Sequence, residues 1–222
     1  MTVILVLGTF ITFLLIDHFF SRRPAVRPVM EVQPQPAAPA VLQPNVVAGF
    51  QVPENLKYHP GHTWAMSEGP KMVRVGLDDF AAKLLGKVHN IMLPQRGQWV
   101  RQGQKLVTLE RDGVKVDMVS PVEGVVTEIN ETAAKDPETA RRDPYGDGWL
   151  VSVESPDAKL NFRNLLSGEL ARWWMDEAAT RLRQHMPIAV GVAQDGGTTI
   201  SDLSTLLGDK EWVDVTREFF LS

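Results

Sequence analysis

Residues 106–130 read LVTLERDGVKVDMVSPVEGVVTEIN, and this stretch decides the fold. Two apolar runs rich in β-branched residues, Leu106–Leu109 and Val122–Ile129, flank a polar turn at Arg111–Gly113. A glycine-containing turn between runs of strand composition predicts a β-hairpin. Ser120-Pro121 then interrupts the pairing, because proline has no N–H to donate to a ladder. The sequence therefore predicts an exposed turn on a rigid β scaffold, a geometry suited to presenting one side chain to another protein.

Short strands surround this hairpin at intervals of roughly ten residues, with glycine or proline between them. They are predicted at Thr63–Ser67, Met72–Leu77, Val88–Leu93 and Trp149–Val153. This spacing is typical of a small β sandwich or barrel. A short helix is predicted at Asp78–Gly86, because acidic residues open it and a glycine closes it.

Two further helical segments are predicted, one at the start of residues 132–142 and the other over residues 158–184. Apolar residues in the second segment recur at spacings of three and four, which indicates an amphipathic helix. Trp173 and Trp174 are adjacent and cannot both face the core. We expect one of them to pack on the β domain and the other to be exposed or covered by the C-terminal extension.

Six sequence blocks occur in an order that is known from one family. They are Tyr58-x-x-x-His62-x-Trp64, Val75-Gly76-Leu77-Asp78-Asp79-Phe80-Ala81, Leu84-Leu85-Gly86, Leu93-Pro94-x-x-Gly97-x-x-Val100, Ser120-Pro121-Val122-x-Gly124-x-Val126 and Asp143-Pro144-Tyr145-Gly146-Asp147-Gly148-Trp149-Leu150. Together they resemble the H-protein of the glycine cleavage system, a lipoyl-carrier family, over about residues 58–182. The resemblance implies a mainly β fold, a lipoyl/biotinyl-like barrel-sandwich hybrid with C-terminal helices, over residues 55–184.

The resemblance also implies where a lipoyl arm would be attached. The lysine that carries the arm in the family stands eight residues before the proline of the Ser-Pro pair, and that position here is Gly113. Glu110 and Asp117 match acidic residues of the family on either side, so the alignment needs no gap. No lipoate is therefore expected at residue 113. Lys115 lies two residues on, and strand alternation would keep it on the same face, so a displaced attachment site is the alternative.

Two functions remain open at this hairpin. An H-protein does no chemistry alone, and carries an aminomethyl group on lipoyllysine between the other glycine cleavage proteins. The first prediction is an H-protein-like module without lipoate, which binds a protein partner, with glycine cleavage components as candidates, through the hairpin tip; the tip residues are Glu110, Arg111, Asp112, Gly113 and Lys115. The second is a working lipoyl carrier with its arm on Lys115.

The chain offers little sign of catalytic or metal chemistry. No nucleophile and base stand at a recognisable spacing, so no enzyme activity or catalytic residue is predicted. His59 and His62 are close in sequence, but no third ligand follows at a suitable spacing, and no metal site is predicted. There is no cysteine, which excludes disulfides and thiolate nucleophiles. A net charge of −4 gives no reason to expect nucleic acid as a partner.

The N-terminal residues 1–23 predict a single-pass transmembrane helix. Thr2–Ile16 is nearly all apolar, and Phe19-Phe20 extend the run. About 20 helical residues cross the hydrocarbon core of a bilayer. A cleavable signal peptide is the alternative, but it would have a basic start and a small-residue cleavage site. Because Arg22, Arg23 and Arg27 follow the span, the positive-inside rule places the rest of the chain in the cytoplasm.

A tether and an extension complete the predicted organisation. Residues 24–54 contain seven prolines and lack a periodic apolar face, which is typical of an unfolded linker. Residues 185–222 lie beyond the family pattern, with a strand expected at 188–192 and helices at 199–207, capped by Thr199 or Ser201, and at 211–221. The role of this extension is open: packing on the domain is the default expectation, and contact with the membrane surface or with a partner are the alternatives.

Overall fold

The computed structural model describes residues 18, 45–186 and 202–221. The chain divides into two compact units, residues 1–41 and 42–222. Only His18 of the first unit is described, so the predicted transmembrane helix and most of the predicted linker lie outside the described residues. Among the described helices, none has the length and apolar character needed to span a membrane.

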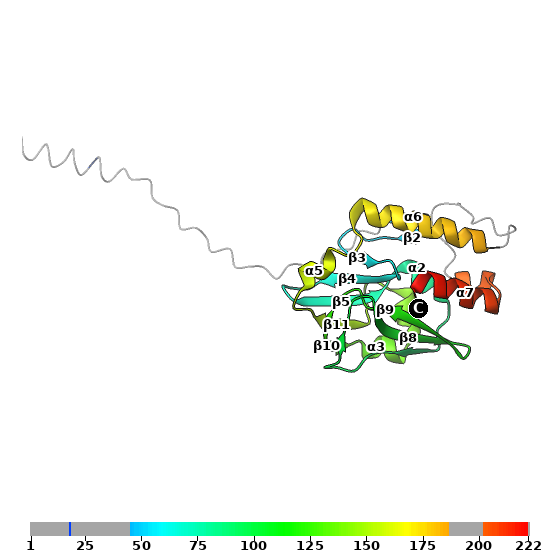
Figure 1. Ribbon diagram of the computed structural model, residues 1–222, viewed down its shortest axis with the longest axis horizontal. Coiled ribbons are helices and arrows are strands. Elements are labelled where there is room, and N and C mark those ends of the chain that lie inside the picture. Colours follow the sequence, from blue (N-terminus) through cyan, green and yellow to red (C-terminus); the bar gives the residue numbers. More distant parts are fainter. Residues whose placement is uncertain (1–17, 19–44, 187–201, 222) are drawn as a thin grey trace, which may run out of the picture. The chain divides into compact units, whose positions relative to one another are not determined.

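Most of the predicted strands join one antiparallel sheet in the order β3-β4-β5-β11-β10-β7. Its strands are β3 (Lys57–His59), β4 (Thr63–Ser67), β5 (Met72–Leu77), β7 (Trp99–Val100), β10 (Gly124–Ile129) and β11 (Val151–Glu154). The predicted bounds of β4 and β5 are confirmed. Figure 1 shows this sheet beside a second one, with helices gathered over their edges.

The second sheet contains the predicted hairpin, but its second strand differs from the prediction. The sheet has the order β6-β8-β9, with β6 (Asn90–Met92), β8 (Lys105–Arg111) and β9 (Val114–Val119). β8 therefore pairs with Val114–Val119, and not with the apolar run 122–129, which joins the first sheet as β10. Val116 and Met118 are buried, whereas Lys115 before them and Asp117 between them are not. This alternation is typical of a strand with one buried face.

The last ten residues of the predicted linker belong to the folded unit. β1 (Val46–Val47) pairs with β2 (Phe50–Gln51), and the buried Phe50 ring lies 5.0 Å from the ring of Phe80. The Gln51 amide donates to the Asp79 carboxylate at 2.8 Å. The prediction of an unfolded linker through residue 54 is wrong for residues 45–54, because one aromatic side chain and this backbone contact anchor a stretch whose composition alone gives no core.

Helices connect and cover the sheets. They are α2 (Asp79–Leu85), α3 (Glu131–Lys135), α4 (Pro137–Arg142), α5 (Ala158–Phe162) and α6 (Gly168–His185). α2 forms where the acidic opening predicted a helix, and the Asp78 side chain caps it by accepting from the Ala81 amide at 2.8 Å. On α6 the two tryptophans divide as expected. Trp174 packs near Tyr58, whereas Trp173 is exposed.

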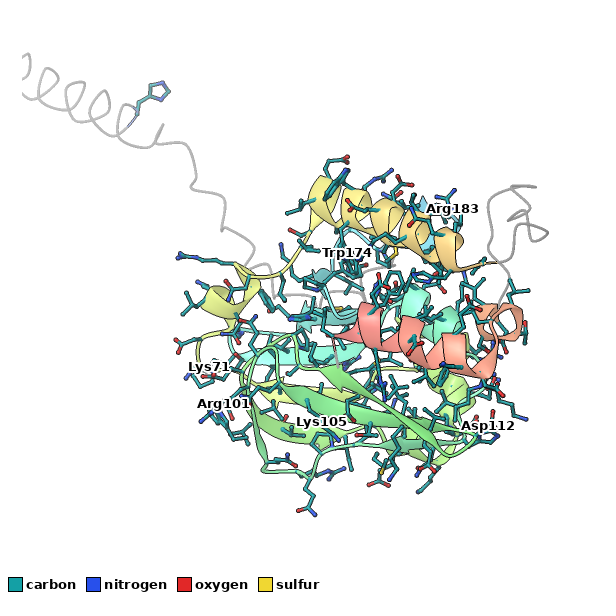
Figure 2. All side chains as sticks on the ribbon, turned by 45° about the vertical axis from the view of Figure 1, so that its right-hand side comes forward. Lys71, Arg101, Lys105, Asp112, Trp174 and Arg183 are labelled. Atoms are coloured by element: carbon teal, nitrogen blue, oxygen red, sulfur yellow. The ribbon has the colours of Figure 1, made fainter. Side chains whose placement is uncertain are left out.

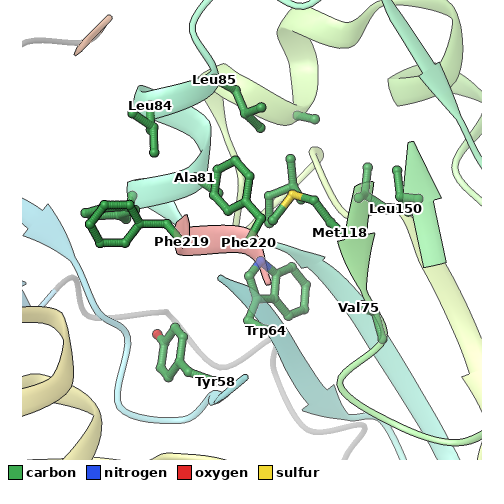
Figure 3. Packing of buried hydrophobic residues seen from close by; sticks show 14 of the residues in the cluster. Tyr58, Trp64, Val75, Ala81, Leu84, Leu85, Met118, Leu150, Phe219 and Phe220 are labelled. Atoms are coloured by element: carbon green, nitrogen blue, oxygen red, sulfur yellow. The ribbon is translucent and has the colours of Figure 1, made fainter. Parts of the chain in front are cut away.

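The C-terminal extension folds onto the domain, as predicted. It contains a 3-10 turn, η1 (Leu203–Leu206), and the helix α7 (Asp209–Phe220). Thr199 and Ser201, the predicted caps, lie outside the described residues; η1 itself is capped by Asp202, whose side chain accepts from the Ser204 amide. The predicted strand 188–192 lies outside the described residues. Figure 3 shows Phe219 and Phe220 of α7 within the buried cluster that also holds Trp64, Ala81 and Leu84.

Candidate functional site at the β8–β9 hairpin

The hairpin ends in a two-residue turn formed by Asp112 and Gly113. Arg111 and Val114 form the last pair of the ladder, which leaves only these two residues between the strands. Both have positive φ, 49° for Asp112 and 80° for Gly113. Two-residue hairpin loops of this kind favour the sequence Asp-Gly, because glycine and aspartate tolerate the left-handed region. Local backbone conformation thus explains the residues at the tip.

Gly113 has room for a side chain but offers no amine. A Cβ placed on this residue would meet no atom within 4 Å, so a side chain here would project into open space. A lipoyl group is attached through an amide to a lysine amine, and glycine has no group that could form that bond. The residue at this position therefore does not fit a lipoyl arm, for a chemical reason and not for lack of space.

Lys115 does not take over the position of the turn. Because Gly113 is in a turn and not extended, the strand alternation expected between residues 113 and 115 does not hold. Lys115 lies within β9, directly opposite Glu110 of β8, and its side chain is exposed. It is an accessible amine on the face of the hairpin, next to an acid, and not at the tip.

Asp117 anchors the polar face on which Lys115 lies. Its carboxylate accepts from the Thr108 hydroxyl at 2.6 Å and from the Lys105 ammonium at 2.8 Å. Partial burial alone would raise the pKa of Asp117, but the hydrogen bonds from Lys105 and Thr108 and the charges of Lys105 and Lys115 lower the pKa below its ordinary value. The resulting face is a mixed, charge-balanced surface.

Arg111, a predicted contact residue, is mostly buried against the domain, while its Nε stays 3.4 Å from the Asp112 carboxylate at the tip. Its guanidinium carbon lies 4.8 Å from the centre of the Trp212 ring, and a weak hydrogen bond reaches the Leu85 carbonyl at 3.4 Å. Only 18% of its side chain is exposed. Asp112, by contrast, extends from the end of the hairpin in Figure 2, with His89 3.9 Å away. The exposed residues of the site are therefore Asp112 and Gly113 at the tip and Lys115 on the face of the hairpin.

Sequence reasoning missed Trp212 as part of this site. The Trp212 indole N–H donates to the Leu84 carbonyl at 2.8 Å, and the side chain is 3% exposed. It links α7 to α2 on one side and to Arg111 of the hairpin on the other. The apolar spacing of Trp212, Val215 and Phe219 indicated a helix face, but no sequence signal indicated which part of the domain this face would contact.

The neighbouring histidines are structural. His62 is buried, stacks on Phe80 with ring centres 4.1 Å apart, and its Nδ1 lies 2.8 Å from the Asp78 carboxylate. His59 accepts a hydrogen bond from the Gly61 amide, and burial, with the charge of His62 adding, lowers the pKa of His59. Within the described residues there is no group of three or more potential metal ligands.

The block that includes Asp143 and Tyr145 stabilises the domain beneath the site. The Tyr145 hydroxyl accepts from the Asp79 amide and donates to the Gln51 carbonyl, and burial raises its pKa well above the usual value. The Trp64 indole donates to the Pro144 carbonyl at 3.0 Å. This block therefore ties α2, the first sheet and the N-terminal hairpin together.

The region that contains the β8–β9 hairpin also matches known proteins. A family profile described as Glycine cleavage H-protein matches residues 56–177. The chain belongs to the glycine cleavage H-protein family. The H protein of Coprothermobacter proteolyticus is 36% identical over 128 residues, which are 58% of this chain and 100% of that protein. The H protein of Rubrobacter xylanophilus is 40% identical over 110 residues, 48% of this chain and 86% of that protein.

Among solved structures, the glycine cleavage system H protein of Mycobacterium marinum is 32% identical, with a TM-score of 0.44, over 47% of this chain and 87% of that one. The family match ends inside α6. The mainly β, lipoyl-type fold with C-terminal helices, as predicted, lies mostly within the matched residues, whereas β1, β2 and α7 lie outside them. This H-protein therefore carries added segments that pack on its core.

Proposed function

We propose that this H-protein-like chain is a membrane-anchored, non-catalytic binding module that carries no lipoyl arm. The observation that carries the proposal is Gly113, which occupies the position of the family's arm-bearing lysine inside a turn with positive φ. Relatives named as glycine cleavage H proteins belong to a family of lipoyl carriers. A chain that keeps the carrier scaffold but not the amine retains the surface for protein contacts and loses the group transfer.

Anchoring belongs to the same proposal. Residues 1–23 have the length and composition of a membrane span, and the arginines after it favour a cytoplasmic domain. A carrier that must visit several enzymes gains from free diffusion, whereas a scaffold gains from a fixed location. We expect the protein to stay in the membrane fraction after alkaline carbonate washing. Release by that wash would contradict an integral anchor.

The candidate partners are other glycine cleavage components, contacted through Asp112 and Gly113 at the open end of the hairpin. The alternative is a working carrier with lipoate on Lys115, and the observation that favours it is the exposure of this amine. The surroundings of Lys115 differ from those of residue 113 in the turn, because Lys115 lies within the β8–β9 ladder opposite Glu110.

The test is the intact mass of the protein purified from its native membrane, followed by peptide mapping. We expect no lipoyl group on any residue while other proteins in the same cells are lipoylated. A mass increase of one lipoyl group that maps to Lys115, and disappears in Lys115→Arg, would establish the alternative and overturn the proposal.

A gain-of-function variant sharpens this test. Gly113→Lys restores the amine in open space, so we expect the variant to be lipoylated at residue 113 when the lipoylation enzymes are present. The matched control is Gly113→Arg, which adds a side chain of similar length that cannot be lipoylated. Lipoylation of Gly113→Lys together with an unmodified parent would show that only the missing amine separates this chain from a carrier.

A further inference from the structure

An exposed tryptophan on α6 marks a second surface. Trp173 is 64% exposed and Leu170, one turn earlier on the same face, is 55% exposed. The opposite face of α6 packs on the domain through Ala171, Met175 and Ala178. Exposing two large apolar side chains side by side on an otherwise well-packed helix is typical of a contact surface.

The charges around this pair are acidic. Glu169, Asp176 and Glu177 flank Leu170 and Trp173 along the helix and are exposed. Arg172 is the one cation within this stretch, and it leans toward Glu169 at 3.9 Å. Within residues 45–186 and 202–221, Asp176 and Glu177 form no ion pair.

The basic residues farther along α6 are engaged elsewhere. Arg181 lies over the Phe219 ring at 5.0 Å and 3.6 Å from Glu218, and Arg183 donates to the Ala179 carbonyl. They therefore leave the negative charge beside Trp173 uncompensated.

The sign of this charge decides between three kinds of occupant. A second copy of the chain, bound through the same patch, would bring Asp176 and Glu177 against their own counterparts. An anionic bilayer surface would repel them as well. A protein surface with lysine or arginine around an apolar pocket would pair with them and bury the indole.

We propose that Leu170 and Trp173 form a docking surface for a partner protein that offers an apolar pocket rimmed by basic side chains. Tryptophan in a desolvated pocket is among the strongest anchors of protein interfaces, and rim charges of opposite sign guide the encounter. In Figure 1, α6 lies on one side of the domain and the β8–β9 hairpin on the other, with α7 between them. This surface is therefore separate from the hairpin tip and goes beyond the function proposed for it.

The experiment places a photoreactive p-benzoylphenylalanine at Leu170 of the full-length chain in native membranes, so that Trp173 stays in place. The matched control carries the same probe in place of Trp99, which is 48% exposed on β7 and has no acidic neighbour in sequence. We expect one protein to be crosslinked from residue 170 and not from residue 99, through a peptide that contains lysine or arginine.

Two variants then test the chemistry. Trp173→Ala and the double variant Asp176→Lys/Glu177→Lys should each lower the crosslinking yield by roughly tenfold. Glu123→Lys/Glu154→Lys makes the same charge change on exposed residues elsewhere and should leave the yield unchanged. Because all of these side chains are exposed, the unfolding midpoint should not move.

Four results would overturn the proposal: crosslinking to lipid, crosslinking to the chain itself or to a second copy, no crosslinked product, or a yield that is insensitive to the charge reversal. The outcome does not depend on whether the chain carries lipoate, so it can fail while the function proposed for the hairpin stands.

Discussion

The tip of the β8–β9 hairpin and the contact between α2 and α7 lie close together but differ in burial. The tip residues Asp112 and Gly113 are exposed, whereas Trp212 at the contact is buried. At the tip, Gly113 has no side chain, and a Cβ placed there would meet no atom within 4 Å. At the contact, Trp212 is buried between the Leu84 carbonyl and the Arg111 guanidinium, although it lies outside the family match.

This difference shows where the chain has changed relative to its family. The matched region keeps the scaffold, and in the function proposed above it lacks the amine that would carry a lipoyl arm, because residue 113 is glycine. The C-terminal extension, which lies outside the family match, adds buried aromatic side chains and contacts the hairpin where Trp212 packs on Arg111. A hairpin that is braced from the domain side is suited to binding, and the following substitutions measure how strongly α7 braces it.

The largest effect is expected for Trp212→Ala. The change removes a nearly fully buried indole, its hydrogen bond to Leu84 and its contact with Arg111, so we expect a loss of roughly 3–5 kcal/mol in the free energy of unfolding. Urea titration followed by circular dichroism measures it. Trp173→Ala is the matched control and should stay within about 0.5 kcal/mol of the parent. Equal effects of the two changes would mean that α7 does not brace the domain.

A smaller effect is expected at the turn itself. Gly113→Ala places a Cβ at φ 80° where no atom crowds it, so the cost of roughly 1 kcal/mol comes from the backbone conformation alone. Gly69→Ala is the control, because Gly69 also faces open space but lacks a positive φ, and it should be neutral or slightly stabilising. Denaturant midpoints decide the matter, and a stabilising Gly113→Ala would contradict the left-handed turn.

The interaction energy between the hairpin and α7 should be about as large as the cost of Gly113→Ala. A double-mutant cycle with Arg111→Met and Trp212→Leu isolates the contact of the guanidinium with the ring, for which we expect roughly 1 kcal/mol. If the coupling energy is near zero, Arg111 does not transmit the packing of α7 to the hairpin, and the tip is held by the strands alone.

The smallest effect concerns acid stability on the polar face of the hairpin. The pKa of Asp117 is lower in the folded protein than its ordinary value of 3.8, so its contribution to stability is present above that value and is lost as pH falls through the lowered pKa. Asp117→Asn should cost less than about 1 kcal/mol at neutral pH, since the pair with Lys105 is largely exposed. The gap between parent and variant should close below pH 3.8 in unfolding titrations, and a gap that widens there would reverse the sign of the shift.

Local sequence signals were sufficient for elements that are set by neighbours in the chain. Asp78 capped α2, β4 and β5 began and ended where predicted, and one of the two adjacent tryptophans on α6 was exposed. The second strand of the hairpin was misassigned because the strongest apolar run, Val122–Ile129, was preferred over the alternating segment Val114–Val119. Pairing depends on which strand can reach across a two-residue turn, and apolar content does not measure this.

Contacts between distant segments explain the other differences. Proline-rich neighbours predict a linker at Phe50 and Gln51, but these residues contact Phe80 and Asp79, which lie about thirty residues away in the sequence. Arg111 was read as an exposed contact residue because it stands in a polar turn, and Trp212 covers it from a hundred residues further on. Neither partner can be recognised from the local pattern.

By itself the sequence determined the family, the strand-rich domain, the positive φ that Asp112-Gly113 adopts and the absence of an amine at residue 113, because these depend on residue identity and on short-range backbone preferences. Only the tertiary structure decided that the hairpin is braced by α7, that Arg111 packs on Trp212 and that Trp173 is left uncovered on α6. These depend on which buried faces meet, and that choice is made by the packing of the whole domain.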